Sequence, residues 1–165
     1  MKARRFLFLS IVCLSCIPAC GPEPVASPPP VSQSGGRSSG SNAAIVEFCR
    51  KNNGLKVGDG ECWTLANEAF KATGKRRPGA ATRVWGRVVD YKAEGVRPGD
   101  IVEFKSALFP GGYITGSKHT AIVAQGGKGQ IIIAEQNMAG SRNVAFRPIN
   151  LNSKIRGNVT VYRPS

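Results

Sequence analysis

The sequence is poor in the side chains that enzymes most often use for acid–base and metal chemistry. It contains one histidine, His119, and only 10 acidic residues against 23 lysines and arginines. Any mechanism that needs an imidazole must therefore use His119. The acidic residues form no cluster dense enough for calcium, because Asp59 and Glu61 alone supply too few oxygen ligands. We accordingly predict no metal site and no cofactor.

The sequence also lacks an apolar run of the ~20 residues that a membrane-spanning helix needs. The run at 6–17 follows Lys2, Arg4 and Arg5, and its length is typical of a signal peptide. It ends at Ile17-Pro18-Ala19-Cys20, which resembles a bacterial lipobox. We therefore expect residues 1–20 to be a signal peptide and Cys20 to carry the only membrane anchor. A plain cleaved signal peptide and a second lipobox-like site ending at Cys16 are the alternatives.

Large apolar residues are almost absent from 21–42, a stretch rich in proline, serine and glycine. Such a segment cannot bury a core, so we predict a disordered tether that holds the following domain away from a membrane surface. Residues 43–165 remain as one folded domain. The expected location is outside the cytoplasm, as a secreted protein or as a cell-envelope lipoprotein anchored through Cys20.

The predicted domain is strongly basic. It holds 19 of the 23 basic and 9 of the 10 acidic residues, which gives a net charge of +10. A basic domain outside the cell is suited to acidic polymers such as anionic wall glycans or lipid headgroups. The basic residues do not alternate with aromatic ones, and no nucleic-acid-binding motif is present, so we expect no nucleic-acid partner.

Hydrophobic periodicity predicts helices followed by an antiparallel sheet, which is an α+β fold. The second helix is the clearest element, because Cys62, Leu65 and Ala69 share one face and Gly74 stops it. A Gly126-Gly127-Lys128-Gly129 turn predicts a hairpin between two apolar strands. The expected helices are 43–52 and 61–73; the expected strands are 84–89, 101–105, 119–125, 130–136, 143–147 and 158–163.

The start of the second helix places Cys62 where a thiol can become reactive. A free thiol has a pKa of ~8.5, and a helix N-terminus or a nearby imidazole lowers it. His119 begins a predicted strand and can point towards that helix end. An imidazole also needs a third group to fix its orientation. Glu135 and Asn137 end the next strand, and the register of the hairpin decides which of them faces the ring.

Each of these residues also has a structural interpretation. A cysteine on an apolar helix face is more often inert core than nucleophile, and a lone histidine is more often structural. Cys49 is the other cysteine of the domain, and outside the cytoplasm it can pair with Cys62 in a disulfide. Such a bridge would remove the nucleophile.

Four sequence blocks resemble the CHAP family of cysteine- and histidine-dependent amidohydrolases and peptidases, which are related to NlpC-type peptidases in the papain-like superfamily. They are Gly60-Glu61-Cys62-Trp63, Arg97-Pro98-Gly99-Asp100-Ile101-Val102, His119-Thr120-Ala121-Ile122-Val123 and Ala134-Glu135-Gln136-Asn137. The resemblance implies a papain-like (CHAP/NlpC-type) fold, with N-terminal helices packed on an antiparallel sheet. It also implies Cys62 as nucleophile, His119 as base, Glu135 as the orienting residue and Asn137 as an auxiliary polar residue.

Residues 60–66, the same His119 and Glu135 blocks, and Val161-Tyr162-Arg163-Pro164 are similar to a narrower group. This group is the cysteine-proteinase-fold domain of fungal actin-patch proteins and plant proteins. The resemblances together predict a cysteine peptidase or amidase acting on a peptide or peptidoglycan-like substrate. A non-catalytic basic binding module on the same fold is the alternative. Trp63, residues 107–118 and the basic loop near Arg76 are expected to shape the substrate groove.

Overall fold

The computed structural model describes residues 40–77 and 83–165. The predicted signal peptide, the anchor at Cys20 and most of the predicted linker 21–42 lie outside the described residues. Within the described ranges, no helix has both the length and the apolar character needed to cross a membrane.

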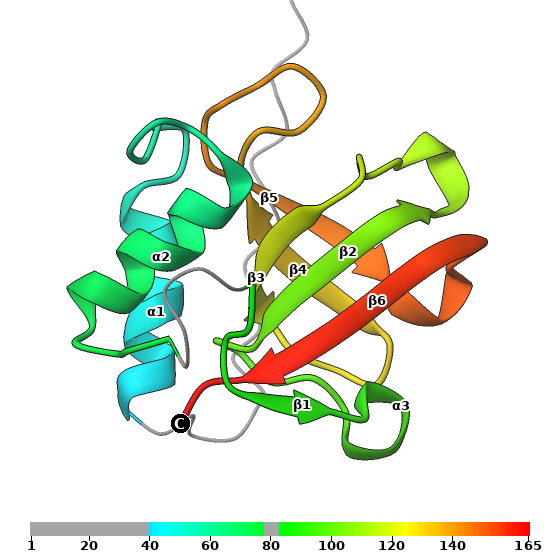
Figure 1. Ribbon diagram of the computed structural model, residues 1–165, viewed down its shortest axis with the longest axis horizontal. Helices are drawn as coiled ribbons and strands as arrows, with labels where there is room; N and C mark the ends of the chain where they lie inside the picture. Colours follow the sequence, from blue (N-terminus) through cyan, green and yellow to red (C-terminus); the bar gives the residue numbers. More distant parts are fainter. Residues whose placement is uncertain (1–39, 78–82) are drawn as a thin grey trace, which may run out of the picture. The chain divides into compact units, whose positions relative to one another are not determined.

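Two helices form one layer of the domain. α1 (Gly40–Lys51) and α2 (Cys62–Ala72) lie side by side on one face of the sheet, as Figure 1 shows. Both helices are confirmed, and α1 begins slightly earlier than predicted. The short helix α3 (Tyr91–Glu94) was not predicted, because one helical turn leaves no periodic pattern in the sequence.

The other layer is a six-stranded antiparallel sheet, which confirms the α+β class. Its order is β1-β6-β2-β3-β4-β5, so the last strand of the chain lies between the first two. All six predicted strands exist with small changes of boundary. The strands are β1 (Arg87–Val89), β2 (Ile101–Leu108), β3 (His119–Gln125), β4 (Gln130–Glu135), β5 (Ala145–Asn150) and β6 (Arg156–Arg163).

The sheet separates two hydrophobic cores, because neighbouring strand residues point to opposite faces. Ile101 and Ile122 pack with Leu65 on the helix side. Val102 and Val123 belong to the second cluster, on the opposite face. β3 lies between β2 and β4 and is buried along nearly its whole length. The strand, which begins at His119, is therefore held in place by the strands on both sides.

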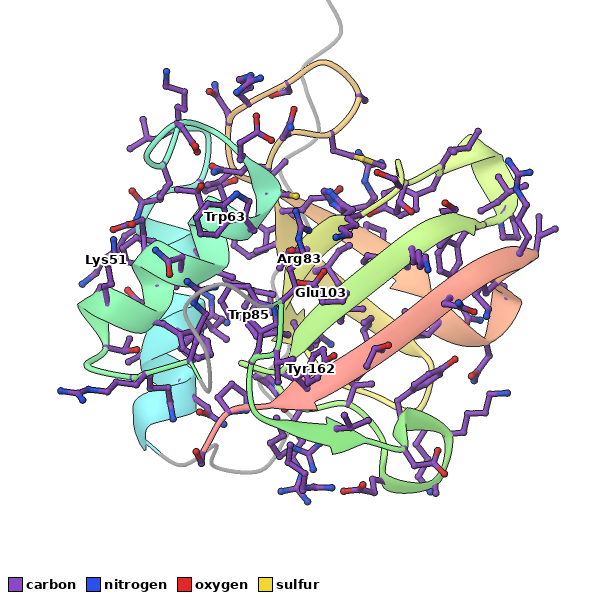
Figure 2. The ribbon with its side chains drawn as sticks, in the orientation of Figure 1. Lys51, Trp63, Arg83, Trp85, Glu103 and Tyr162 are labelled. Carbon is purple, nitrogen blue, oxygen red and sulfur yellow. The ribbon has the colours of Figure 1, made fainter. Side chains whose placement is uncertain are left out.

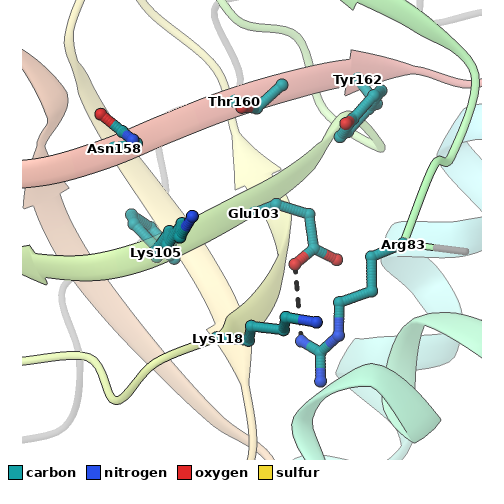
Figure 3. A pocket seen from close by; sticks show the side chains of 8 residues that line it. Arg83, Glu103, Lys105, Lys118, Asn158, Thr160 and Tyr162 are labelled. Carbon is teal, nitrogen blue, oxygen red and sulfur yellow. Dashed lines mark hydrogen bonds and ion pairs between the residues drawn. The ribbon is translucent and has the colours of Figure 1, made fainter.

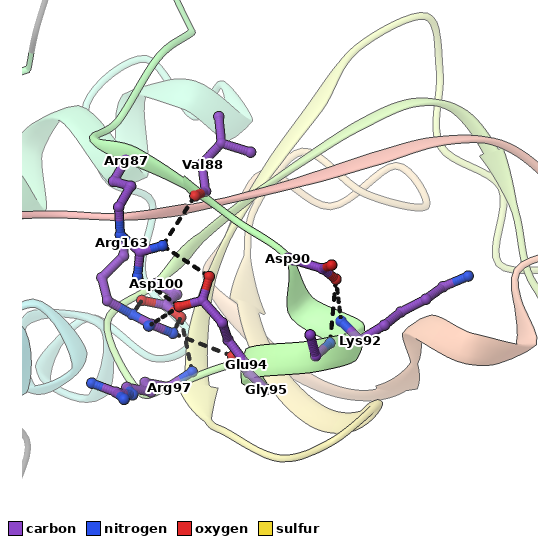
Figure 4. Close-up of polar contacts among 10 residues, drawn as sticks. Arg87, Val88, Asp90, Lys92, Glu94, Gly95, Arg97, Asp100 and Arg163 are labelled. Carbon is purple, nitrogen blue, oxygen red and sulfur yellow. Dashed lines mark hydrogen bonds and ion pairs between the residues drawn. The ribbon is translucent and has the colours of Figure 1, made fainter.

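A buried ion pair ties the C-terminal strand to the turn that precedes β2 (Figure 4). The Arg163 guanidinium donates to both oxygens of Asp100, at 3.0 and 2.8 Å, and the backbone N–H of Arg97 also donates to this carboxylate. Asp100 is fully buried. The Arg97-Pro98-Gly99-Asp100 block therefore has a structural role: it fixes the start of β2 next to the end of β6.

Candidate active site

The loop before α2 is held so that the helix begins at Cys62. The buried Gln136 side chain accepts from the backbone N–H of Val57 and donates to the carbonyl oxygens of Val57 and Glu61. Gly60 has a φ of +86°, and an added Cβ would lie 2.9 Å from the side chain of Arg142. This backbone path therefore requires glycine immediately before the Glu61-Cys62 pair.

His119 lies at the first position of β3 and faces Cys62. Its ring stacks on Phe104 of β2, with the ring centroids 6.1 Å apart. Its Nε2 is 2.8 Å from Oε2 of Glu135, and the thiol of Cys62 is its other hydrogen-bond partner. Because Nε2 is engaged by the carboxylate, Nδ1 is the ring nitrogen left for the sulfur.

Glu135 is the residue that steadies the imidazole. It is 1% exposed and accepts three hydrogen bonds, from His119, from the Tyr113 hydroxyl at 2.6 Å and from Nε of Arg147 at 2.7 Å. Burial raises its pKa, but these bonds prevail and the net pKa of Glu135 is lowered. The carboxylate is therefore held in its charged form.

The electrostatics of the pair favour a thiolate and an imidazolium. Burial opposes ionisation of Cys62, yet the hydrogen bonds from His119 and from the backbone N–H of Thr120 lower its pKa from 9.0 to about 7, with help from the charge of Arg83. Burial also opposes the charged form of His119, whereas its bonds to Cys62 and Glu135 raise its pKa from 6.5 to about 9. Between these two values the thiolate–imidazolium form predominates.

The other predicted residues lie in different surroundings. Asn137 does not take the place of Glu135: its side-chain amide donates to Oε2 of Glu61 at 2.7 Å. Cys49 and Cys62 are both free thiols, so the alternative disulfide is not formed. Burial raises the pKa of Cys49 to about 12, which makes it an inert core residue.

A polar network behind the sulfur was not predicted from the sequence. Nη1 of Arg83 lies 3.9 Å from Sγ of Cys62 and donates to the Thr120 hydroxyl at 2.9 Å. Glu103 binds Arg83 at 3.5 Å and accepts from Nε1 of Trp85 at 2.6 Å. Figure 2 shows Arg83, Trp85 and Glu103 close together between the helices and the sheet. No short-range pattern announces this network, because its members come from three separate segments.

Two cavities flank the cluster. The larger, about 450 Å³, is lined by Arg83 together with residues of β2 and β6 and by Lys118 (Figure 3). The smaller, about 250 Å³, includes Tyr113 and Arg147, the two residues that bind Glu135 beside His119. Of the segments expected to shape a groove, 107–118 contributes residues to both cavities, whereas Trp63 and Arg76 line neither of them.

Comparison with solved structures identifies the fold. The crystal structure of Ly7917 superposes with a TM-score of 0.51 at 18% identity, over 74% of this chain and 62% of that one. NlpC2 from Trichomonas vaginalis gives a TM-score of 0.50 at 18% identity, over 79% of this chain and 48% of that one. At this level of identity the likeness concerns the fold alone, which is papain-like and NlpC-type, as predicted.

Comparison of sequences identifies the family. Altered inheritance of mitochondria protein 3 from Debaryomyces hansenii is 31% identical in an alignment of 145 positions, which covers 73% of this chain but only 15% of that protein. Residues 36–165 match the AIM3/BBC1 cysteine proteinase-fold domain. The chain therefore belongs to the AIM3/BBC1 cysteine proteinase-fold domain family.

Proposed function

We propose that this domain is a cysteine hydrolase that cleaves an amide or peptide bond, with Cys62 as nucleophile, His119 as general base and acid, and Glu135 as the residue that orients His119. One observation carries the proposal. A cysteine in the first turn of α2 is hydrogen-bonded to the only imidazole of the chain, and that imidazole is held from behind by a buried carboxylate at 2.8 Å. A purely structural thiol has no need of a lowered pKa.

The reaction proceeds in two steps. The Cys62 thiolate attacks the carbonyl carbon, and the electron pair of the C=O bond moves to oxygen. Collapse of this intermediate breaks the C–N bond, and the leaving amine takes the proton from Nδ1 of His119. A water molecule then gives a proton to the same nitrogen and attacks the thioester, which releases the acid and restores the thiolate–imidazolium pair.

Charge that develops on the substrate oxygen needs hydrogen-bond donors. The backbone N–H of Cys62 is in the first turn of α2, where amides have no partner within the helix. The Arg83 guanidinium, 3.9 Å from Sγ, is a second donor close to the reacting atoms. Both act from fixed positions, which is the arrangement that stabilises an oxyanion.

The proposed location is the cell exterior or cell envelope, with Cys20 as the lipid anchor. The basic run, apolar run and lipobox-like end of residues 1–20 support it. Peptide bonds in peptidoglycan are one substrate consistent with that location and with the CHAP-like sequence blocks. The basic surface of the domain also suits an acidic polymer as the support that it meets.

Alkylation of the sulfur tests the proposed chemistry. The rate of iodoacetamide labelling is measured from pH 5 to 10 on the peptide that contains Cys62, by mass spectrometry. We expect a midpoint near pH 7, a shift to higher pH in His119→Ala, and slow labelling of Cys49 as an internal control. A rate no faster than that of glutathione, unchanged in His119→Ala, would remove the basis for an enzyme.

Activity is then measured on purified wall material, by loss of turbidity, and on a fluorogenic peptide library. Cleavage that disappears in Cys62→Ser would support hydrolysis. A reactive Cys62 with no cleavage of either substrate would instead favour a basic binding module on the same fold, in which the site is a remnant.

A further inference from the structure

The larger cavity beside Cys62 has an excess of positive charge. It is lined by Arg83, Lys105 and Lys118, with Glu103 as the single acidic residue. Asn158 and Thr160 of β6 provide uncharged polar groups on the same wall. In the close-up of Figure 3, the side chains of Lys118 and Arg83 approach each other near Glu103.

Glu103 does not neutralise the lysines, because its oxygens are already engaged. Oε1 accepts from Trp85 at 2.6 Å and from the hydroxyl of Thr120 at 2.7 Å, and Oε2 binds Arg83 at 3.5 Å. Burial raises the pKa of Glu103 while these bonds lower it, and the net shift is upward. The Glu103 carboxylate therefore interacts with Arg83, Trp85 and Thr120 and does not pair with the lysines.

Lys105 and Lys118 are both exposed, and neither has a carboxylate within 4.0 Å in the part of the chain that the structure describes. They come from different segments: Lys105 lies in β2 and Lys118 immediately precedes β3. Both side chains line the same cavity, where their positive charges repel each other, and an anion bound in the cavity relieves this repulsion.

Arg83 links the cavity to the reacting sulfur, because it lines the cavity and its Nη1 is 3.9 Å from Sγ of Cys62. When the amide carbon of a substrate lies at Sγ, the residues next to it extend towards this cavity or towards the smaller one beside Tyr113. The two cavities differ in charge: only the larger one has cations without a paired anion.

We propose that the larger cavity is a substrate subsite for a carboxylate, carried by an acidic side chain or by the end of a chain, close to the scissile amide. This proposal rests on the proposed hydrolase function. Lys105 and Lys118 bind the carboxylate as mobile point charges, while Arg83 remains fixed by Glu103 and Thr120 and positions the adjoining backbone. The preference for an anion is then a property of residues outside the Cys62–His119–Glu135 cluster.

A labelling experiment tests the subsite without requiring hydrolysis. The probes are iodoacetate, which is anionic, and iodoacetamide, which is neutral and nearly the same size. We expect the iodoacetate rate divided by the iodoacetamide rate at Cys62 to be about three- to tenfold lower in Lys105→Gln/Lys118→Gln than in wild type. This difference between the two proteins should shrink in 1 M salt. Lys128→Gln is the matched control, because Lys128 lies on the turn after β3 and lines neither cavity. An equal ratio in all three proteins would overturn the proposal.

Substrates then distinguish the sources of the carboxylate. Peptide pairs carry Glu or Gln next to the cleaved bond, and each is made with a free or an amidated C-terminus. A preference for Glu indicates an internal acidic residue, and a preference for the free acid indicates a chain end; either should approach unity in the double lysine variant. No preference in any pair would refute the subsite. If the wild-type protein cleaves no peptide, the hydrolase proposal fails, and the alkylation ratio alone decides whether the cavity selects anions.

Discussion

Replacing Glu135 with Gln tests how the buried carboxylate controls the reactivity of the sulfur. The substitution keeps the size of the side chain and an oxygen that can accept from Nε2 of His119, but it removes the negative charge. In the wild-type protein this charge lies 2.8 Å from the ring and both side chains are almost fully buried. The imidazolium therefore loses one of the two partners that stabilise it, the other being Cys62.

The size of the effect follows from the short distance. An opposite charge this close shifts a pKa by about 1–3 units, so the pKa of His119 should fall by about that amount. The thiol then faces a neutral ring, and the pKa of Cys62 should rise from about 7 towards its ordinary value. At pH 7 the fraction of thiolate, and with it the alkylation rate, should fall about 5- to 50-fold.

The measurement is the pH dependence of iodoacetamide labelling at Cys62. Glu47→Gln is the matched control, because Glu47 is a half-exposed residue of α1 whose ion pair with Arg50 spans 3.9 Å. It makes the same change of net charge and should leave the midpoint where it is. If the Glu135→Gln midpoint stays within about 0.3 units of wild type, the carboxylate does not hold the proton on His119, and the assigned role is wrong.

Three further outcomes are expected. Arg163→Met removes the ion-pair partner of the buried Asp100 carboxylate, so the free energy of unfolding measured in urea titrations should fall by about 3 kcal/mol. The control Arg50→Met removes an exposed ion pair and should cost less than about 0.5 kcal/mol. Gln136→Ala should cost about 2–3 kcal/mol and slow labelling of Cys62, because the three hydrogen bonds of this buried side chain are lost; a loss below about 0.5 kcal/mol would contradict this. Between pH 6.5 and 9, the stability that comes from the raised pKa of His119 is lost as pH rises, while the stability that comes from the lowered pKa of Cys62 is gained. The free energy of unfolding of the wild-type protein should therefore be nearly constant over this range. In Cys62→Ala only the His119 contribution remains, so the free energy of unfolding should fall by about 1–2 kcal/mol from pH 6.5 to pH 9.

Local patterns were sufficient for the elements that carry the site. The start of α2 follows from the glycine-rich loop before Cys62 and the apolar face after it. The β3–β4 hairpin follows from two apolar runs on either side of a glycine turn, and the first residue of β3 was predicted correctly. These features depend on neighbours in sequence, which is why they can be read without the fold.

Register and long-range contacts decide the rest. Both Glu135 and Asn137 had suitable chemistry, and only the paired strands with their irregularity between 123 and 125 show that Glu135 receives the ring. Arg83 lies in an irregular segment, so its approach to Cys62 depends on the position of β2 and β3. Tyr113 is likewise brought to Glu135 by a loop, and no local pattern fixes a loop's path.

The end of β4 joins the two halves of the site through consecutive residues. Glu135 contacts the ring of His119, and the next side chain, Gln136, secures the loop that leads into Cys62. Since successive residues of an extended chain point in opposite directions, a slip of one position in the β3–β4 pairing would exchange their surroundings. An insertion of one residue in the glycine turn that shifts this pairing would therefore separate Glu135 from His119 and Gln136 from the loop before Cys62. The site would lose its geometry although none of its residues had been replaced.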